Sequence, residues 1–317
     1  MTGPPAATAA VRVAVRRCLA DLPAGPPVAA AVSGGADSLA LAAALSFERP
    51  GSVALVVDHG LQPGSRAVAE RAAAQCRGLG LDAELLGNQQ HPGAVDVGGG
   101  PEAAARALRY RLLDAAVERR ALAAVLLGHT RDDQAETVLL ALARGSGARS
   151  LAGMPAARGV YRRPLLDLPR GTVRAACREA GLEPVDDPHN ADPAYARVRV
   201  RATAMPALEQ ALGPGVAAAL ARTAAQLRED ADALDALTPD LPVEPDVERV
   251  AALPPALRSR ALKQWAEQRC GRALTAAHVE ALRALVERWH GQGAVALPGG
   301  GCAVRRDGRL AYLPRQW

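Results

Sequence analysis

Residues 33–38 read SGGADS and follow an apolar run at residues 27–32. Backbone N–H groups in a Gly-Gly turn that leads into a helix form a cradle for a phosphate. The stretch lacks the lysine of a Walker loop and does not match the GxGxxG fingerprint of dinucleotide sites. The alternative is that its polar residues only cap the helix that follows. The candidate nucleotide-binding residues are Ser33, Gly34, Gly35, Ala36, Asp37 and Ser38.

Asp37 adds a negative charge beside this predicted cradle. A carboxylate next to a phosphate is unfavourable unless a cation lies between them. Mg²⁺ bridges carboxylate and phosphate oxygens in this way. We therefore predict that Asp37 is a metal ligand and takes part in catalysis.

A second polar group lies in GHTRDDQAET (128–137), where Asp132 and Glu136 share a helix face at a spacing of four. Acidic residues in a first helical turn are also ordinary partners of the helix dipole. A magnesium ion on a triphosphate would recruit a second carboxylate from an opposite loop. We predict Asp133, or else its neighbour Asp132, as the second metal-binding or positioning carboxylate, and His129 as a nucleotide contact.

The elements that must position these residues follow a βαβ rhythm. Each apolar run is followed by a turn and a longer helical pattern, which predicts an α/β fold with a doubly wound parallel sheet. Ligands bind at the carboxyl ends of such strands, so Asp58 and His59, after the second run, are candidate base or ribose contacts. His59 could equally be an ordinary polar loop residue. The predicted strands are residues 27–32, 52–57, 82–86 and 121–127.

The rhythm changes past residue 145, and a long helical pattern begins near Pro214. We predict two domains, a catalytic one over residues 1–213 and a smaller, mainly helical one over residues 214–317. Short alternating runs near the C-terminus predict a hairpin or a three-stranded piece there.

The amino-acid composition further limits the class of protein. The net charge is +5, and Lys263 is the only lysine. The excess arginine reflects either a coding bias or an affinity for phosphates. The five cysteines form no CxxC pair, which argues against zinc ribbons and iron–sulfur sites. No apolar run reaches the length of a signal peptide or a membrane span, so we predict a cytoplasmic protein without a membrane partner.

SGGADS resembles the SGGxDS signature of the PP-loop, or N-type, ATP pyrophosphatase superfamily, whose fold is adenine nucleotide alpha hydrolase-like. Its members adenylate a substrate and release pyrophosphate. Four further stretches resemble, in order and spacing, the motifs of the tRNA(Ile)-lysidine synthase family in its short architecture. They are VDHGL (57–61), EAAARALRY (102–110), GHTRDDQAETVLLALARGSG (128–147) and DDPHNADPAYARVRVR (186–201).

This resemblance implies ATP and Mg²⁺ as cofactors, and as substrates free L-lysine and a tRNA(Ile) with a CAU anticodon. The wobble cytidine would be adenylated, and lysine would displace AMP to give lysidine. It also implies catalytic roles for Arg106, contacting the ATP phosphates or the substrate nucleotide, and for Arg201. Val198 stands where the family usually has asparagine, so local hydrogen bonding differs there.

Arg197, Arg199 and Arg201 alternate with valines, so they share one face if the segment is extended and spread around it if helical. For Arg106 the alternative to a site role is a solvated charged helix face.

Two rival functions remain at this stage, a tRNA thiolation enzyme of the same superfamily and a nucleotide-sensing module without catalysis. The sequence leaves open the lysine-binding residues, the tRNA identity determinants, the role of the β tail and the oligomeric state, a homodimer included.

Overall fold

The computed structural model describes residues 3–58, 64–87, 100–185 and 192–314, with only the backbone described at residues 100–103. His59 lies outside these ranges. The chain divides into two compact units, Met1–Gln226 and Leu227–Trp317. The division falls within helix α10 (Val216–Ala236), which begins just after the boundary predicted at residue 213.

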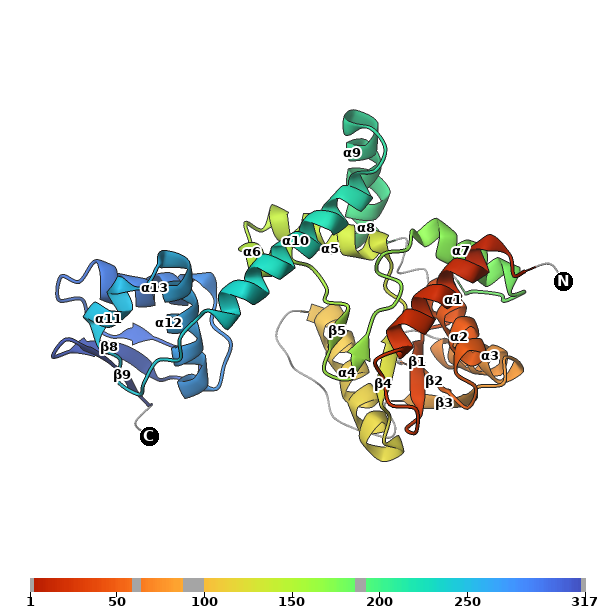
Figure 1. Cartoon of the computed structure of the whole chain (residues 1–317), viewed down its shortest axis with the longest axis horizontal. Helices are drawn as coiled ribbons and strands as arrows, with labels where there is room; N and C mark the ends of the chain where they lie inside the picture. The colour runs from red at the N-terminus through yellow and green to blue at the C-terminus, as the bar shows by residue number, and fades with distance from the viewer. Residues whose placement is uncertain (1–2, 59–63, 88–99, 186–191, 315–317) are drawn as a thin grey trace. The chain divides into compact units, whose positions relative to one another are not determined.

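The first unit is built on a six-stranded sheet of order β3-β2-β1-β4-β6-β5. All adjacent pairs are parallel except β5 and β6. The predicted α/β parallel sheet is therefore confirmed (Figure 1). The strands are β1 (Val28–Val32), β2 (Val53–Asp58), β3 (Asp82–Gly87), β4 (Ala124–Leu127), β5 (Ala157–Arg158) and β6 (Tyr161–Arg162).

Helices cover both faces of this sheet because its central strand is apolar on both. Val28, Ala30 and Val32 of β1 belong to a core shared with one helix layer. Ala29 belongs to the opposite core, which α4 (Gly100–Arg120) covers with Leu112 and its neighbours. The first layer comprises α1 (Ala6–Leu19), α2 (Ala36–Glu48), α3 (Ser65–Gly78) and α7 (Arg170–Glu179).

The remaining helices of this unit follow β4 or the loop after α7. The segment that could have been extended is helical, since α8 (Ala196–Arg199) runs into the π-helical turn η3 (Val200–Ala204). Helix α2 begins at Ala36, which places Asp37 in its first turn. The other helices are α5 (Arg131–Ala143), α6 (Ala148–Leu151) and α9 (Met205–Leu212).

The second unit has its own core around the fully buried Trp265 and Leu282. The Trp265 indole nitrogen donates a hydrogen bond to the Val243 carbonyl at 3.0 Å. Helices α11 (Val247–Ala252), α12 (Pro255–Cys270) and α13 (Ala276–Glu287) precede an antiparallel sheet. Its strands are β7 (Val295–Ala296), β8 (Cys302–Arg306) and β9 (Arg309–Leu313).

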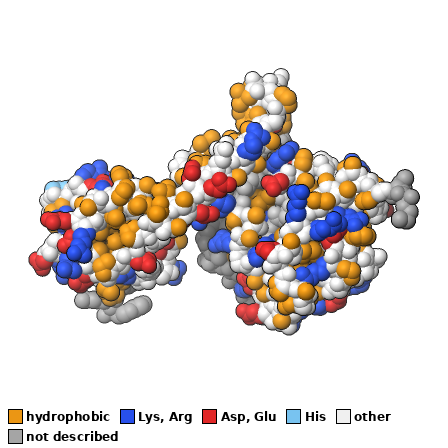
Figure 2. Space-filling view, viewed as in Figure 1, with side chains coloured by type: hydrophobic (Ala, Val, Ile, Leu, Met, Phe, Trp, Pro, Cys, Tyr) orange, Lys and Arg blue, Asp and Glu red, His pale blue; other side chains and the backbone are white. Residues whose placement is uncertain are grey.

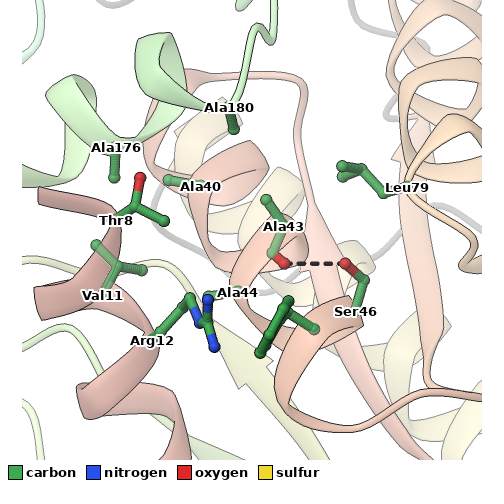
Figure 3. A pocket seen from close by; sticks show the side chains of 11 residues that line it. Thr8, Val11, Arg12, Ala40, Ala43, Ala44, Ser46, Leu79, Ala176 and Ala180 are labelled. Atoms are coloured by element: carbon green, nitrogen blue, oxygen red, sulfur yellow. Dashed lines mark hydrogen bonds between the residues drawn. The ribbon is translucent and has the colours of Figure 1, made fainter. Parts of the chain in front are cut away.

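A hollow of about 370 Å³ lies among α1, α2 and α7 (Figure 3). Five of its eleven lining residues are alanine, and its one charged side chain, Arg12, bonds Glu48 at 2.8 Å. The hollow lies in the helix layer and contains none of the predicted site residues. No helix in the described part of the chain is both long and apolar enough to span a membrane.

Candidate active site

The SGGADS loop closes on itself at the carboxyl end of β1. The Ser38 hydroxyl accepts a hydrogen bond from the Ser33 N–H at 3.1 Å and donates one to the Gly35 carbonyl at 2.8 Å. Gly34 has φ +85°, a conformation that favours glycine. Its carbonyl accepts a hydrogen bond from the Val185 N–H at 3.0 Å. Ser38 therefore shapes the loop in addition to any contact with a ligand.

Gly128 brings the end of β4 against this loop. A Cβ atom at Gly128 would lie 3.1 Å from the Asp37 carbonyl oxygen and 3.2 Å from the Ser38 nitrogen. Both neighbours are backbone atoms and cannot swing away. This close approach places the GHTRDDQAET segment beside Asp37.

Asp37 carries the unsatisfied carboxylate of the site. Its Oδ1 is buried and has no hydrogen-bond partner among the described residues, and its Oδ2 lies 3.9 Å from the Arg170 Nε. Burial and the nearby Asp133 raise the pKa of Asp37 to about 6, although arginines including Arg170 oppose the shift. An orphaned carboxylate oxygen fits a hard cation completed by phosphate and water oxygens. Among the described residues no group of three or more His, Cys, Asp or Glu could hold a metal by itself.

Asp133 is bonded through both oxygens. Its Oδ2 accepts hydrogen bonds from the Thr130 N–H and hydroxyl, both at 2.8 Å, forming the capping box of α5. Its Oδ1 lies 2.7 Å from the Arg170 Nη2 and 3.3 Å from the Arg201 Nη2. Burial raises the pKa of Asp133, but Arg170 and the Thr130 bonds outweigh it, so the net shift is downward. A metal role for Asp133 stays a prediction that would require it to exchange a partner.

Asp132 makes a contact that positions a helix. Its Oδ2 accepts a hydrogen bond from the backbone N–H of Arg170 at 2.8 Å, at the start of α7. The two adjacent aspartates therefore tie α5 to α7 through one residue, Asp132 to its backbone and Asp133 to its side chain.

Glu136 is the centre of a buried ion cluster and is only 1% exposed. Its Oε1 accepts hydrogen bonds from the Arg170 Nη2 at 3.0 Å and the Arg201 Nε at 2.8 Å. Its Oε2 lies 3.1 Å from the Arg201 Nη2 and 3.4 Å from the Arg197 Nε. A buried carboxylate is stable only when paired and hydrogen-bonded in this manner.

The π-helical turn η3 overlaps the segment that serves this cluster, with Arg197 before the turn and Arg201 within it. Arg197 and Arg201 both reach α5, whereas Arg199 donates to the Pro193 and Ala194 carbonyls at 2.6 and 2.8 Å. Single π turns inside helices occur frequently at functional sites. Because the segment is helical, Arg197 and Arg201 face α5 and Arg199 does not.

His129 and Arg106 lie at the edge of the described cluster. The His129 Nδ1 is buried without a partner, and burial lowers its pKa to about 4 against the opposing effect of Asp133. The imidazole is therefore neutral at pH 7. Arg106 is exposed and lies over the Tyr110 ring at 5.1 Å. Its positive charge contributes to the low pKa of His129, but the described contacts of Arg106 include no ion pair with the cluster.

The comparisons with known proteins agree with this geometry. A model of the PP-loop domain matches residues 10–208, and a model of the TilS substrate binding domain matches residues 246–311. A tRNA(Ile)-lysidine synthase from Thermobifida fusca is 52% identical over 98% of both chains. One from Streptomyces coelicolor is 50% identical over 97% of this chain and 98% of its own. The chain belongs to the tRNA(Ile)-lysidine synthase family.

Membership in the lysidine synthase family establishes a PP-loop enzyme that uses ATP. A solved U34-tRNA thiolase from Methanococcus maripaludis has a TM-score of 0.59 over 70% of this chain and 80% of its own. At 20% identity that likeness concerns the fold alone.

Sequence reasoning placed Asp37, Asp132, Asp133 and Arg201 together, and in the lysidine synthase fold they lie together. It missed Arg170, which contacts more members of the cluster than any other described residue. The sequence signal that could have identified Arg170 was its position at the start of a helix that follows a parallel strand. Asp58, predicted to follow the second strand, is the last residue of β2, and its contact with a nucleotide stays a prediction.

Proposed function

We propose that this protein ligates free L-lysine to C2 of the wobble cytidine in a tRNA(Ile) with a CAU anticodon. ATP adenylates the cytidine with release of pyrophosphate, and the lysine amine then displaces AMP to give lysidine. The product reads AUA in place of AUG. The observation that carries the proposal is the position of the SGGADS loop and the unpaired Asp37 oxygen beside the arginine-rich cluster, in a chain of this family.

The first half of the reaction falls to the SGGADS loop. Its backbone N–H groups and the N-terminus of α2 suit the phosphates of ATP. Asp37 would hold Mg²⁺, which supplies charge neutralisation to the leaving pyrophosphate when bound. Arg106, exposed on α4, is free to meet developing charge on the transferred group. His129 offers a neutral buried nitrogen to nucleotide or base.

The second half of the reaction requires a pocket for free lysine, which carries one carboxylate and two ammonium groups. The ion cluster offers both signs of charge, with Asp133 and Glu136 as acceptors and Arg197 and Arg201 as donors. We propose that lysine binds by exchanging with these internal pairs, its ammonium groups meeting carboxylates and its carboxylate meeting a guanidinium. The substitution Arg201→Lys should then raise the KM for lysine more than the KM for ATP, and an equal rise of both would contradict the assignment.

The tRNA is proposed to contact both units, with the second unit contributing affinity away from the chemistry. Residues 246–311 carry eleven Lys or Arg against six Asp or Glu. A basic surface of this kind binds phosphate backbones in a salt-dependent manner. A cytoplasmic location and a homodimeric state remain predictions of the sequence.

The decisive experiment uses the purified chain with ATP, Mg²⁺, labelled lysine and a tRNA(Ile) transcript bearing CAU. We expect incorporation of lysine and, after nuclease digestion, an anticodon nucleoside heavier than cytidine by one lysine less water. The matched control is the same transcript with its wobble cytidine replaced by uridine. Sulfur incorporation from a thiol donor, without lysine incorporation, would contradict the proposal and support the thiolation enzyme.

A further inference from the structure

The β8–β9 hairpin carries positive charge that its own unit does not neutralise. Several basic side chains elsewhere in this unit pair with carboxylates, such as Arg260 with Asp235 at 2.8 Å and Arg283 with Glu287 at 3.0 Å. Arg305, Arg306 and Arg309 form no ion pair with a carboxylate anywhere in the described part of the chain.

Their described polar contacts are to carbonyl groups. The Arg305 Nη1 donates to the Leu285 carbonyl at 3.1 Å, and the Arg309 Nη1 donates to the Glu244 carbonyl at 3.2 Å. Asp307, in the turn between the strands, makes no described ion pair with either of them. The full guanidinium charges therefore remain available to an external anion.

A large aromatic side chain lies next to this charge. The Arg305 Cζ lies 5.3 Å from the centre of the Trp289 ring, and Trp289 is 39% exposed. Trp265, by contrast, is 1% exposed in the core of the same unit. Exposing an indole costs apolar burial, and the guanidinium beside it holds the ring in a defined orientation. Aromatic rings beside cations are the elements that bind single-stranded nucleic acid.

A similar pair in the first unit shows what distinguishes Trp289. Phe47 is 61% exposed and Arg12 lies over its ring at 3.2 Å. However, Arg12 and Arg16 both bond Glu48, at 2.8 and 2.7 Å, so the cations there are neutralised within the protein. Exposure of an aromatic ring under an arginine is thus common to both pairs, and unpaired charge is particular to the hairpin.

We propose that Trp289 and the hairpin arginines form a contact surface for the tRNA substrate, in which one unpaired base stacks on Trp289 and adjacent phosphates meet Arg305 and Arg306. The base must be unpaired because bases inside a duplex are already stacked. This inference rests on the proposed function for the identity of the RNA. Figure 2 shows Lys and Arg side chains on the visible surface of this unit, interspersed with acidic ones.

The test measures binding of the full chain to the tRNA(Ile) transcript without ATP or lysine. We expect Trp289→Ala to weaken the Kd about ten-fold, because stacking contributes strongly to single-stranded RNA binding, and Trp289→Phe to lose only about three-fold. Phe47→Ala is the matched control and should stay within about two-fold of the wild type. A folded Trp289→Ala protein that binds as tightly as Phe47→Ala would overturn the proposal. Should Trp289→Ala fail to fold, wild-type affinity in a folded Trp289→Tyr,Arg306→Ala double variant would overturn it equally.

Salt dependence separates the ring from the charges. Arg306→Ala should reduce the slope of log Kd against log salt concentration by about one, whereas Trp289→Ala should leave the slope unchanged. The effect of Trp289→Ala should vanish on a fully double-stranded RNA of equal length. An equal effect on the duplex would overturn the stacking assignment.

Lysidine formation distinguishes this inference from the proposed function. Wild-type protein that binds the transcript but forms no lysidine would refute the function and leave the surface standing. Lysidine formation with equal KM for tRNA in the wild type and Trp289→Ala would refute the surface and leave the function standing.

Discussion

The ion cluster around Glu136 and the β8–β9 hairpin use the same residue type in opposite ways. In the cluster Arg170, Arg197 and Arg201 face carboxylates inside the protein, at distances of 2.7 to 3.4 Å. On the hairpin Arg305 and Arg306 face no described carboxylate. Buried guanidiniums fix the positions of other groups, because an unpaired charge there would be costly. Solvent-accessible guanidiniums are stabilised by water and can pair with an external anion when it binds.

The largest effect should come from Asp37, beside the ion cluster, whose Oδ1 has no hydrogen-bond partner in the described part of the chain. Asp37→Ala should lower the rate of pyrophosphate release about 10³-fold, because a preorganised charge acts mainly on the transition state. The Kd for the tRNA transcript should stay near the wild-type value. If tRNA binding fell as far in this variant as in Trp289→Ala, the two regions would not have separate tasks.

The second prediction concerns stability and tests whether burial separates the two regions. Glu136→Ala removes the acceptor of three guanidiniums from a site that is 1% exposed. We expect the free energy of unfolding to fall by about 3 kcal/mol, because Arg170 and Arg201 keep Asp133 but lose the buried carboxylate that they share with Arg197. Urea unfolding monitored by circular dichroism measures this change.

The matched control is Glu70→Ala, which breaks an exposed pair with Arg66 at 2.7 Å. That pair should contribute less than about 0.5 kcal/mol. Equal losses in the two variants would show that burial is not what makes the cluster rigid.

The third prediction uses the depressed pKa of His129, about 4 in the folded chain. The unfolded imidazole takes up its proton near pH 6.5, so the wild type should lose stability as the pH falls from 6.5 toward 4. Glutamine does not titrate, so the His129→Gln variant lacks this pH dependence. We expect the free energy of unfolding of the wild type, relative to this variant, to drop by about 3 kcal/mol between pH 7 and pH 4.

Asp37→Asn gives the opposite slope and serves as the comparison. The pKa of Asp37 is raised to about 6, so its contribution to stability is present below pH 4 and is lost as the pH rises through 6. The wild type should therefore weaken relative to Asp37→Asn on going from pH 4 to pH 6. Parallel slopes for the two variants would contradict the burial of both groups.

The smallest expected effect belongs to the contact that joins the two loops. A Cβ at Gly128 would press on the Asp37 carbonyl from 3.1 Å, so Gly128→Ala should move the loop by a few tenths of an ångström. We expect kcat to fall about ten-fold with the tRNA Kd unchanged, since reaction rates depend steeply on alignment. Gly145→Ala has open space at its Cβ but a φ of +62°, and it should leave kcat unchanged at a small cost in stability.

Sequence reasoning predicted the sheet well because its signals are local. The runs at residues 27–32 and 82–86 became β1 and β3 within a residue at each end. The SGGADS loop was predictable for the same reason, since a strand, a glycine pair and a helix start follow one another directly. These patterns depend only on neighbours in the chain.

The arginines were harder because their roles depend on distant partners. Arg170 bonds Asp133 and Glu136, which lie more than thirty residues earlier in the chain, and the sequence of its own helix does not predict these contacts. The family resemblance implied a site role for Arg106, yet its described ring contact is with Tyr110. The resemblance implied a role for Arg201, but its sharing of Glu136 with Arg197 followed only once the segment was known to be helical, because valines between them fit a strand as well.

The π-helical turn at Val200–Ala204 has a consequence for how the length of this chain can vary. Such a turn holds one more residue than an α-helical turn. Deleting Val200 would restore a regular α-helix and shorten the spacing of Arg197 and Arg201 from four residues to three. Arg197 lies before the turn and Arg201 within it, so the deletion would shift the two guanidiniums that share Glu136 relative to each other. Homologous chains should therefore vary in identity along this segment far more readily than in length.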